Sequence, residues 1–361
     1  VRAPGKAGMS PQARRHNEMR RQAVRAHPEL KSLAGPNPWT ALALPVLLML
    51  HWGIAWAVSD GGILVVGLTA FLVGQIVIHA CGSLVHETAH KLILRGDRAK
   101  LGFDLGLEFI LASYGKQLTY QHEHITSHHP YMGDYERDYE HEDICAFQAR
   151  QVLKADHPRW QRLMTGLTLV IHALPLGFLI GDEVLPRLVA WLSGRPVKDP
   201  DRHIGATRAP AWQVRLFIAV SAASNLLMFL LLGPWALLYH IWSLSFFLGK
   251  LGISNLGQSL SEHSGSDEIN PTRSTYGWIN LLLFNTGYHS EHHTFPTVPW
   301  TRLPRLHQAA PEVFDNPAGQ SYLGYWWDHV RRDFSASRHN VLQDGDNLAR
   351  CSGTPAVKPA E

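Results

Sequence analysis

The sequence predicts an all-α, polytopic membrane protein, and three observations carry this prediction. Hydrophobic residues make up 45% of the 361 residues and charged residues only 17%, which is apolar for a soluble protein. Long uncharged runs occupy residues 41–58, 61–85 and 216–249. Histidine occurs 22 times, and many of these histidines fall in tight clusters, which is typical of metal binding. Apolar spans joined to a polar, metal-binding body account for all three.

About four transmembrane helices in two hairpins are expected. The first two runs are separated only by Ser59 and Asp60, and each is close to the ~20 residues that cross a bilayer. The run at 216–249 is too long for one crossing and is interrupted by Gly233 and Pro234, which favours a second hairpin.

Two shorter apolar segments remain, at residues 101–114 and 163–181, and the second is expected to lie in the interface or to pair with residues 184–192 as a shallow hairpin. A crossing at 163–181 would put the later histidine clusters on the opposite side from the earlier ones, so we expect none there.

Charge and cysteine content exclude several other classes of protein. Residues 1–38 carry eight Lys or Arg against two Glu and are interpreted as a basic cytoplasmic arm, followed by a membrane domain at 39–335 and a disordered tail at 336–361. No aromatic-rich module follows the arm, so nucleic-acid binding is not expected. The three cysteines form no CxxC pair, which excludes a disulfide framework and a cysteine zinc site. Basic flanks predict that both termini and the histidine clusters face the cytosol.

Four histidine clusters stand out, and they are HETAH (86–90), HITSHH (124–129), SEH ending at 263 and HSEHH (289–293). Helical residues spaced by three or four share a face, so each cluster can direct two or three imidazoles to one point. Iron that reacts with dioxygen suits neutral imidazole ligands, and two irons need roughly eight to ten of them. The nine candidate ligands are His86, His90, His124, His128, His129, His263, His289, His292 and His293.

The surroundings of the clusters give further expectations. His86 directly follows the second apolar run, so the metal should lie just outside the bilayer. Carboxylates adjoin the clusters and are candidates to accept hydrogen bonds from the ligating rings: Glu87, Glu123, Glu262 and Glu291. His122 is likewise a candidate to contact a ligating ring without binding the metal itself. Histidines in apolar runs are expected to be packed residues and not ligands: His51, His79, His172 and His240.

Two other classes of function stay open from these residues. HETAH alone matches the zinc-peptidase pattern HExxH, in which Glu87 would be the general base. That interpretation leaves the two clusters with paired histidines unexplained. A non-catalytic lipid- or metal-binding membrane protein is the other alternative.

Several stretches are similar to the sphingolipid Δ4-desaturase (dihydroceramide desaturase) branch of the membrane fatty acid desaturases. They are residues 20–38 (RRQAVRAHPELKSLAGPNP), HETAH, HHPYMG (128–133), GQSLSEH (257–263) and residues 280–312, which include GYHSEHHTFP. Little similarity is found at residues 140–215. The resemblance implies four spans, a cytosolic helical cap and a non-haem di-iron centre held by the nine histidines. It also implies dioxygen as co-substrate and a fatty-acyl or ceramide-like lipid as substrate.

Two departures from that branch affect the expected reaction. Gln258 occupies a position where the branch has histidine, and the second cluster reads HxxxHH where HxxHH is usual.

Desaturation needs two electrons from outside, and the chain lacks the His-Pro-Gly-Gly of a fused cytochrome b5. A separate donor of the cytochrome b5 or ferredoxin type is therefore expected, docking on the basic arm. The alternative reaction is hydroxylation of the lipid chain by the same di-iron chemistry.

Overall fold

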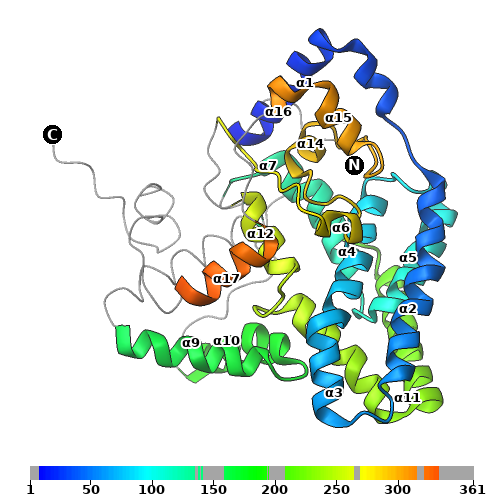
Figure 1. Ribbon diagram of the computed structural model, residues 1–361, viewed down its shortest axis with the longest axis vertical. Helices are drawn as coiled ribbons and strands as arrows, with labels where there is room; N and C mark the ends of the chain where they lie inside the picture. Colours follow the sequence, from blue (N-terminus) through cyan, green and yellow to red (C-terminus); the bar gives the residue numbers. More distant parts are fainter. Residues whose placement is uncertain are drawn as a thin grey trace.

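The computed structural model describes residues 8–134, 137, 138, 140, 158–192, 194, 208–263, 269–314 and 321–332. Within these ranges the regular secondary structure is entirely helical, with no strand, which confirms the all-α class (Figure 1). The segment 336–361, expected to be a disordered tail, lies outside the described residues.

Among the described residues, three helical stretches are long and apolar enough to cross a membrane, namely Pro28–Ala57, Gly62–Ala89 and Ala211–Leu248. They cover the three uncharged runs of the sequence. The first contains the short helices η2 (Pro28–Leu33) and η3 (Pro38–Leu42) and then α2 (Ala43–Ala57). The second joins α3 (Gly62–Thr69), the π-helical segment η4 (Ala70–Gly74) and α4 (Gln75–Ala89), and the third is α11 (Ala211–Leu248).

The helical geometry of α11 breaks where the sequence indicated an interruption. Gly233 has φ 83° and ψ −177°, and Pro234 follows it without a backbone N–H to donate. Such a positive φ strains any residue with a Cβ atom, so glycine is required at this position. The stretch thus consists of two helical segments joined at Gly233.

Small residues let the end of α11 approach the second stretch closely. A Cβ atom at Gly74 would lie 2.0 Å from Oγ of Ser243, and one at Gly82 would lie 2.8 Å from the ring of Phe247. Glycine at such contacts allows helix backbones to pack against each other. This packing brings the C-terminal end of α11 beside α4, the helix that carries the first histidine cluster.

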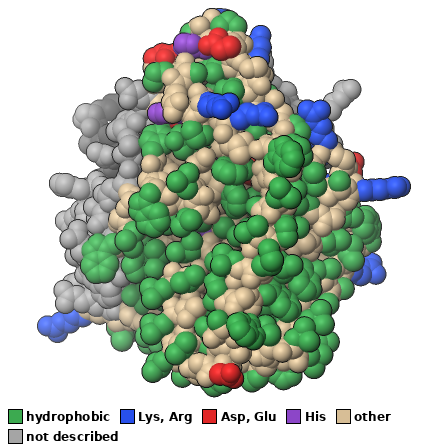
Figure 2. Space-filling view, turned by 45° about the vertical axis from the view of Figure 1, so that its right-hand side comes forward, with side chains coloured by type: hydrophobic (Ala, Val, Ile, Leu, Met, Phe, Trp, Pro, Cys, Tyr) green, Lys and Arg blue, Asp and Glu red, His purple; other side chains and the backbone are tan. Residues whose placement is uncertain are grey.

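The outer surface of these helices is apolar. Hydrophobic side chains cover most of the face in Figure 2, whereas Lys, Arg and His gather toward its top. Leu64, Met49 and Leu231 are each more than 65% exposed. Apolar patches of this extent would be unfavourable in water, and contact with lipid accounts for them.

Two helices connect the first pair of stretches to the second histidine cluster, α5 (Asp97–Leu111) and α6 (Lys116–Glu123). α5 packs alongside α2, where the rings of Trp52 and Phe109 stack with centroids 5.5 Å apart. The buried Glu108 accepts hydrogen bonds from Ser113 Oγ and Gly115 N, both at 2.9 Å, and so ties the end of α5 to the start of α6. α6 then leads directly into His124.

Residues expected at the interface form α9 (Pro158–His172), η6 (Leu179–Val184) and α10 (Leu185–Leu192). In Figure 1 α9 and α10 run across the direction of α3. The turn after α9 is held at the end of α11 by two hydrogen bonds of 2.7 Å, from Trp242 Nε1 to Ala173 O and from Leu176 N to Ser245 Oγ.

A helical cap lies at the end of the molecule where α4 terminates. It contains α1 (Pro11–Ala26), α7 (His129–Tyr131), α12 (Asn255–His263), α14 (His289–Thr294), α15 (Leu303–Ala309) and α16 (Pro311–Phe314), whereas α17 (Tyr322–Arg332) reaches back along the second stretch, where Trp326 packs near Phe71. Figure 1 shows α1 beside α14, α15 and α16. Met19 and Ala23 of α1 share a buried cluster with Phe295, Leu306 and Phe314. The first helix therefore covers the last histidine cluster.

Candidate metal centre

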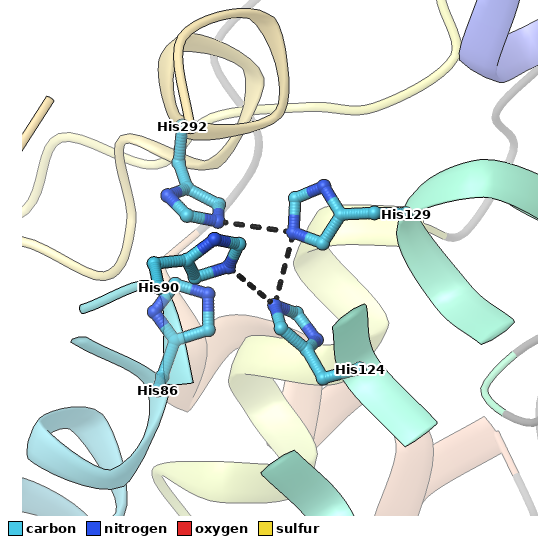
Figure 3. Close-up of side chains that lie close together, drawn as sticks. All are labelled: His86, His90, His124, His129 and His292. Atoms are coloured by element: carbon cyan, nitrogen blue, oxygen red, sulfur yellow. Dashed lines mark hydrogen bonds between the residues drawn. The ribbon is translucent and has the colours of Figure 1, made fainter. Parts of the chain in front are cut away.

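All nine candidate histidines lie together in two groups, and within each group the candidate ligand atoms lie within 4.8 Å of one another. The first group consists of His86, His90, His124, His129 and His292 (Figure 3). The second consists of His128, His263, His289 and His293, all buried. His122 belongs to neither group.

The two groups draw on several clusters because of local helix geometry. His86 and His90 lie four residues apart at the end of α4, and both join the first group, as expected. Residues 124–128 form a π-helical segment, η5 (His124–His128), in which residues five apart come one above the other. Nε2 of His124 accordingly lies 3.0 Å from Nε2 of His129, whereas His128 points into the second group. The second and fourth clusters each direct two imidazoles to one group, as expected, and send the third, His128 or His292, to the other group.

The nitrogens that face each other fit metal ions better than hydrogen bonds. Nε2 of His124 lies 3.1 Å from that of His90, and Nε2 of His129 lies 3.3 Å from that of His292. In the second group the Nε2 atoms of His289 and His263 are 3.0 Å apart. Each neutral imidazole carries one N–H, which is too few donors for hydrogen bonds among all the nitrogens that converge here. Two nitrogens that each lie about 2.1 Å from one metal ion, with a right angle at the ion, are about 3 Å apart, which matches the spacing in both groups. The donor set is therefore suited to two imidazole-bound ions.

Burial keeps most of these rings in the form that binds metal. It lowers the pKa of His90, His129 and His292 well below the usual range, and neighbouring imidazoles lower the pKa further. Ligation requires the neutral ring, so these histidines are prepared for it. His128 differs, because Glu140 and Asp138 outweigh its burial and raise its pKa to about 9.

Carboxylates reach the outer nitrogen of two candidate ligands. Oδ1 of Asp138 lies 2.9 Å from Nδ1 of His128, and Oε1 of Glu262 lies 3.4 Å from Nδ1 of His289. The hydrogen bond to Asp138 fixes the proton on Nδ1 of His128 and leaves its Nε2 free for a metal, whereas Oε1 of Glu262 forms no hydrogen bond at its distance from His289. Asp138 was not among the expected residues, and the role expected for Glu262 stays a prediction.

Glu87 and Glu291 bond to other segments around the site. Oε2 of Glu87 accepts a hydrogen bond of 3.3 Å from Trp300 N. Glu291 accepts bonds from Ser274 Oγ at 2.6 Å and Tyr276 Oη at 2.8 Å, and lies 2.7 Å from His307 Nδ1. Glu123 ends α6 immediately before His124.

Glu140 is a second residue that sequence reasoning missed. Its Oε2 atom lies 3.2 Å from Nε2 of His263 and 3.4 Å from Nε2 of His128, and its Oε1 atom lies 3.9 Å from Nδ1 of His124. These histidines lower the pKa of Glu140 well below its usual range although burial acts in the opposite direction. Glu140 stands in the acid-rich sequence DYERDYEHED, where spacing alone does not distinguish one carboxylate from another.

The histidines expected to be packed are absent from both groups. Nε2 of His51 lies 2.8 Å from Nδ1 of His240, and Lys250 N donates to Nδ1 of His172 at 3.2 Å. His79 Nε2 lies 2.5 Å from Oε1 of Gln258. The residue that replaces a family histidine is thus engaged with α4 and not with the ligand groups.

A cavity of about 180 Å³ lies between α1 and the two groups. Its lining includes His129 of the first group, His293 of the second, and His16 and Arg20 of α1. His16 is buried, and its Nδ1 and Nε2 lie 2.9 Å from Thr294 Oγ1 and 3.2 Å from Thr272 Oγ1. Burial, mainly, lowers the pKa of His16 to about 3.

Comparison with known proteins agrees with this architecture. A profile of the fatty acid desaturase family matches residues 61–326, and the chain belongs to this family. The protein is accordingly an oxidoreductase. Its similarity lies with the sphingolipid Δ4-desaturase branch, as the sequence motifs indicated.

Three relatives illustrate that similarity. The sphingolipid delta(4)-desaturase of Schizosaccharomyces pombe is 28% identical over 87% of this chain and 82% of its own. The human sphingolipid delta(4)-desaturase DES1 is 25% identical, and the human sphingolipid delta(4)-desaturase/C4-monooxygenase DES2 is 26% identical, each over 88% of both chains. No solved structure matches the chain.

Proposed function

We propose that this protein is a membrane di-iron desaturase that introduces a double bond into a fatty-acyl or sphingoid, ceramide-like chain, using dioxygen and two electrons from a separate donor. The observation that carries the proposal is the convergence of nine histidines in two groups at the end of α4. That helix belongs to a stretch long and apolar enough to cross a membrane. A lipid tail could therefore reach the site from the bilayer.

The chemistry assigns the oxidation to the metal and the positioning to the protein. Two irons bound by the histidines would supply the oxidising power needed to remove hydrogen from unactivated methylenes, which acid–base side chains lack. Asp138 holds a proton on the outer nitrogen of His128, and Glu262 lies 3.4 Å from the outer nitrogen of His289. The buried second group keeps bulk water away from the reacting position.

The proposed topology has four crossings in two hairpins, with the centre and both termini in the cytosol. The break at Gly233 divides α11 into two segments, and in the proposed second hairpin the shorter one, residues 234–248, crosses together with the residues that follow it. Lys91, Arg95 and Arg98 follow the first hairpin at the end that carries the histidines, and basic residues favour the cytosolic side. In this arrangement residues 39–335 form the membrane domain, and α1, within the basic segment 1–38, belongs to the cap.

The proposed substrate is a membrane lipid. The relatives are named for action on sphingolipids, which supports a ceramide-like substrate. Apolar side chains are exposed on α9 and α10, for example Val170, Val189 and Trp191, which suits a pair lying in the interface where a head group would be held.

Hydroxylation is the second candidate outcome. One relative is named both desaturase and C4-monooxygenase. Both reactions begin with loss of one hydrogen from the lipid chain. The position of the lipid chain beside the centre then decides whether it loses a second hydrogen or gains oxygen. A zinc peptidase is less well supported, because His86 and His90 share their group with three more histidines, whereas catalytic zinc sites have three protein ligands.

The proposed electron donor is an acidic protein of the cytochrome b5 or ferredoxin type. Arg14, Arg20, Arg21 and Arg25 are exposed on α1, and the cavity beneath α1 reaches His129 and His293. A basic surface steers an acidic partner toward it. Docking there would bring the donor close to both ligand groups.

The test is mass spectrometry of lipids from cells that express the protein with a donor, beside cells that express His263→Ala. The proposal expects lipids lighter by two hydrogens with the wild-type chain and none with His263→Ala. Products that carry only an added oxygen would assign hydroxylation. No oxygen-dependent change in any lipid class would contradict the proposal.

A further inference from the structure

Glu140 approaches the candidate ligands from a different side than the other carboxylates. Asp138 and Glu262 contact Nδ1 atoms, the outer nitrogens of His128 and His289. Oε2 of Glu140 instead lies 3.4 Å and 3.2 Å from the Nε2 atoms of His128 and His263. Those Nε2 atoms are the ones that converge with the other histidines of the second group, at 3.2 Å for His128 with His293.

The two groups differ in their number of histidines, five against four. Adding the carboxylate of Glu140 to the second group gives each group five donors. The distances from Glu140 Oε2 to the two Nε2 atoms are close to the 3.0 Å and 3.2 Å between the imidazole nitrogens themselves. Oε2 of Glu140 therefore lies beside two of the four converging nitrogens of the second group, and a candidate ligand oxygen of Glu140 also lies within 4.8 Å of ring nitrogens of His124 and His128.

The second oxygen of Glu140 faces the other group. Oε1 lies 3.9 Å from Nδ1 of His124, a histidine of the first group whose Nε2 faces His90 and His129. A modest movement would allow Nδ1–H of His124 to donate to this oxygen, which would direct Nε2 toward the metal. One carboxylate thus contacts both groups.

We infer that Glu140 is a ligand of the metal ion held by His128, His263, His289 and His293, and that its other oxygen orients His124 of the neighbouring group. This inference rests on the proposed di-iron function. It gives the centre one anionic ligand beside nine neutral ones. Two divalent ions in a buried site need compensating negative charge, which neutral imidazoles do not supply.

The competing explanation is that Glu140 serves only as a hydrogen-bond acceptor for the surrounding rings. A purely structural acceptor would leave the coordination of both irons unchanged when it is replaced by an amide. A ligand would not, because a neutral amide binds ferrous iron more weakly than a carboxylate. The electronic environment of each iron therefore distinguishes the two roles.

The experiment uses the purified full-length chain loaded with iron-57 and compares its Mössbauer spectra and iron content with those of Glu140→Gln. The wild type should show two iron environments. In Glu140→Gln one environment should be shifted or lost, with iron falling toward half, while the other environment remains. Unchanged spectra of Glu140→Gln at full iron content would overturn the inference.

Glu262→Gln is the matched control, because Oε1 of Glu262 lies 3.4 Å from the outer nitrogen of His289 in the same group. It should weaken iron binding by no more than about 10- to 100-fold, as changes at the outer nitrogens of ligands do, and show wild-type spectra when iron is in excess. Asp138 is unsuited to this purpose, because its Oδ1 accepts a hydrogen bond of 3.1 Å from Glu140 N. Spectra of Glu262→Gln that match those of Glu140→Gln would also contradict the inference.

A measurement on the wild type covers the case in which Glu140→Gln does not fold. An experimental structure of the iron-loaded protein should place one Glu140 oxygen in direct coordination to one iron, and an iron surrounded by nitrogen and water alone would overturn the inference. A wild type that binds no iron would instead contradict the proposed function itself, so the two failures are distinguishable.

Discussion

His128 and His293 lie with their Nε2 atoms 3.2 Å apart, although 165 residues separate them in the sequence. His128 leaves a π-helical segment that follows α6, and His293 belongs to the short helix α14. Their approach joins the first half of the chain to the last third at one buried point. Substitution at this point should therefore affect both the metal centre and the docking of α14.

Replacing His128 by alanine should remove both irons together, because this ring also contacts Asp138 and Glu140 and its loss disturbs the neighbouring group. Iron per chain, measured by mass spectrometry of purified protein, should fall more than about tenfold. His122→Ala is the control, since His122 belongs to neither group, and it should retain its iron. Full iron in His128→Ala would contradict the assignment.

Topology can be tested with single cysteines introduced at exposed positions and a membrane-impermeant thiol reagent. Arg21→Cys and Glu312→Cys should react only from the cytosolic side, and Asp60→Cys and Pro234→Cys only from the other side. The proposed two hairpins require this division. Labelling of positions 21 and 312 from opposite sides of the membrane would refute the proposed topology.

Gln258→His should change the ratio of desaturated to hydroxylated product without reducing iron content. Gln258 is paired with His79 at 2.5 Å and stands outside both ligand groups, so its replacement alters the wall beside the centre and not the ligands. Lipid mass spectrometry gives the ratio, and metal analysis gives the iron. Loss of iron in this variant would instead make position 258 part of the metal site.

Stability should fall as the pH drops below about 6.5, and His16 should contribute one proton to this dependence. Because its pKa is about 3 in the folded protein and 6.5 otherwise, the unfolded chain binds the additional proton between these values. Above pH 6.5 this proton does not affect the free energy of unfolding. On acidification between the two pKa values, the free energy of unfolding falls by ~1.4 kcal/mol for each pH unit.

His16→Asn keeps a polar side chain but does not titrate. The difference in melting temperature between pH 7.5 and 5.5 should be smaller for this variant than for the wild type, measured on metal-free protein in detergent. An equal pH dependence in both would show that His16 does not bind this proton.

The sequence predicted those features that depend on local pattern. Uncharged runs located α2, α4 and α11, and Gly233 with Pro234 marked the break in α11. Tight clustering identified all nine histidines of the two groups. Each of these signals is carried by residues near one another in the chain.

Features that depend on tertiary contacts were not predicted. The π-helical segment η5 pairs His124 with His129, and no periodicity in the sequence indicated it. Glu140 became recognisable only when the chain folded back to bring it near His263. His16 does carry a local signal, because Ala13, His16, Met19 and Ala23 form a stripe at helical spacing that predicts a buried face.

Two irons held by the two histidine groups underlie every other proposal made for this protein, and metal analysis of the purified wild-type chain measures them. We expect about two irons per chain, with zinc and other metals far below that amount. One zinc per chain in a fully active preparation would contradict this expectation.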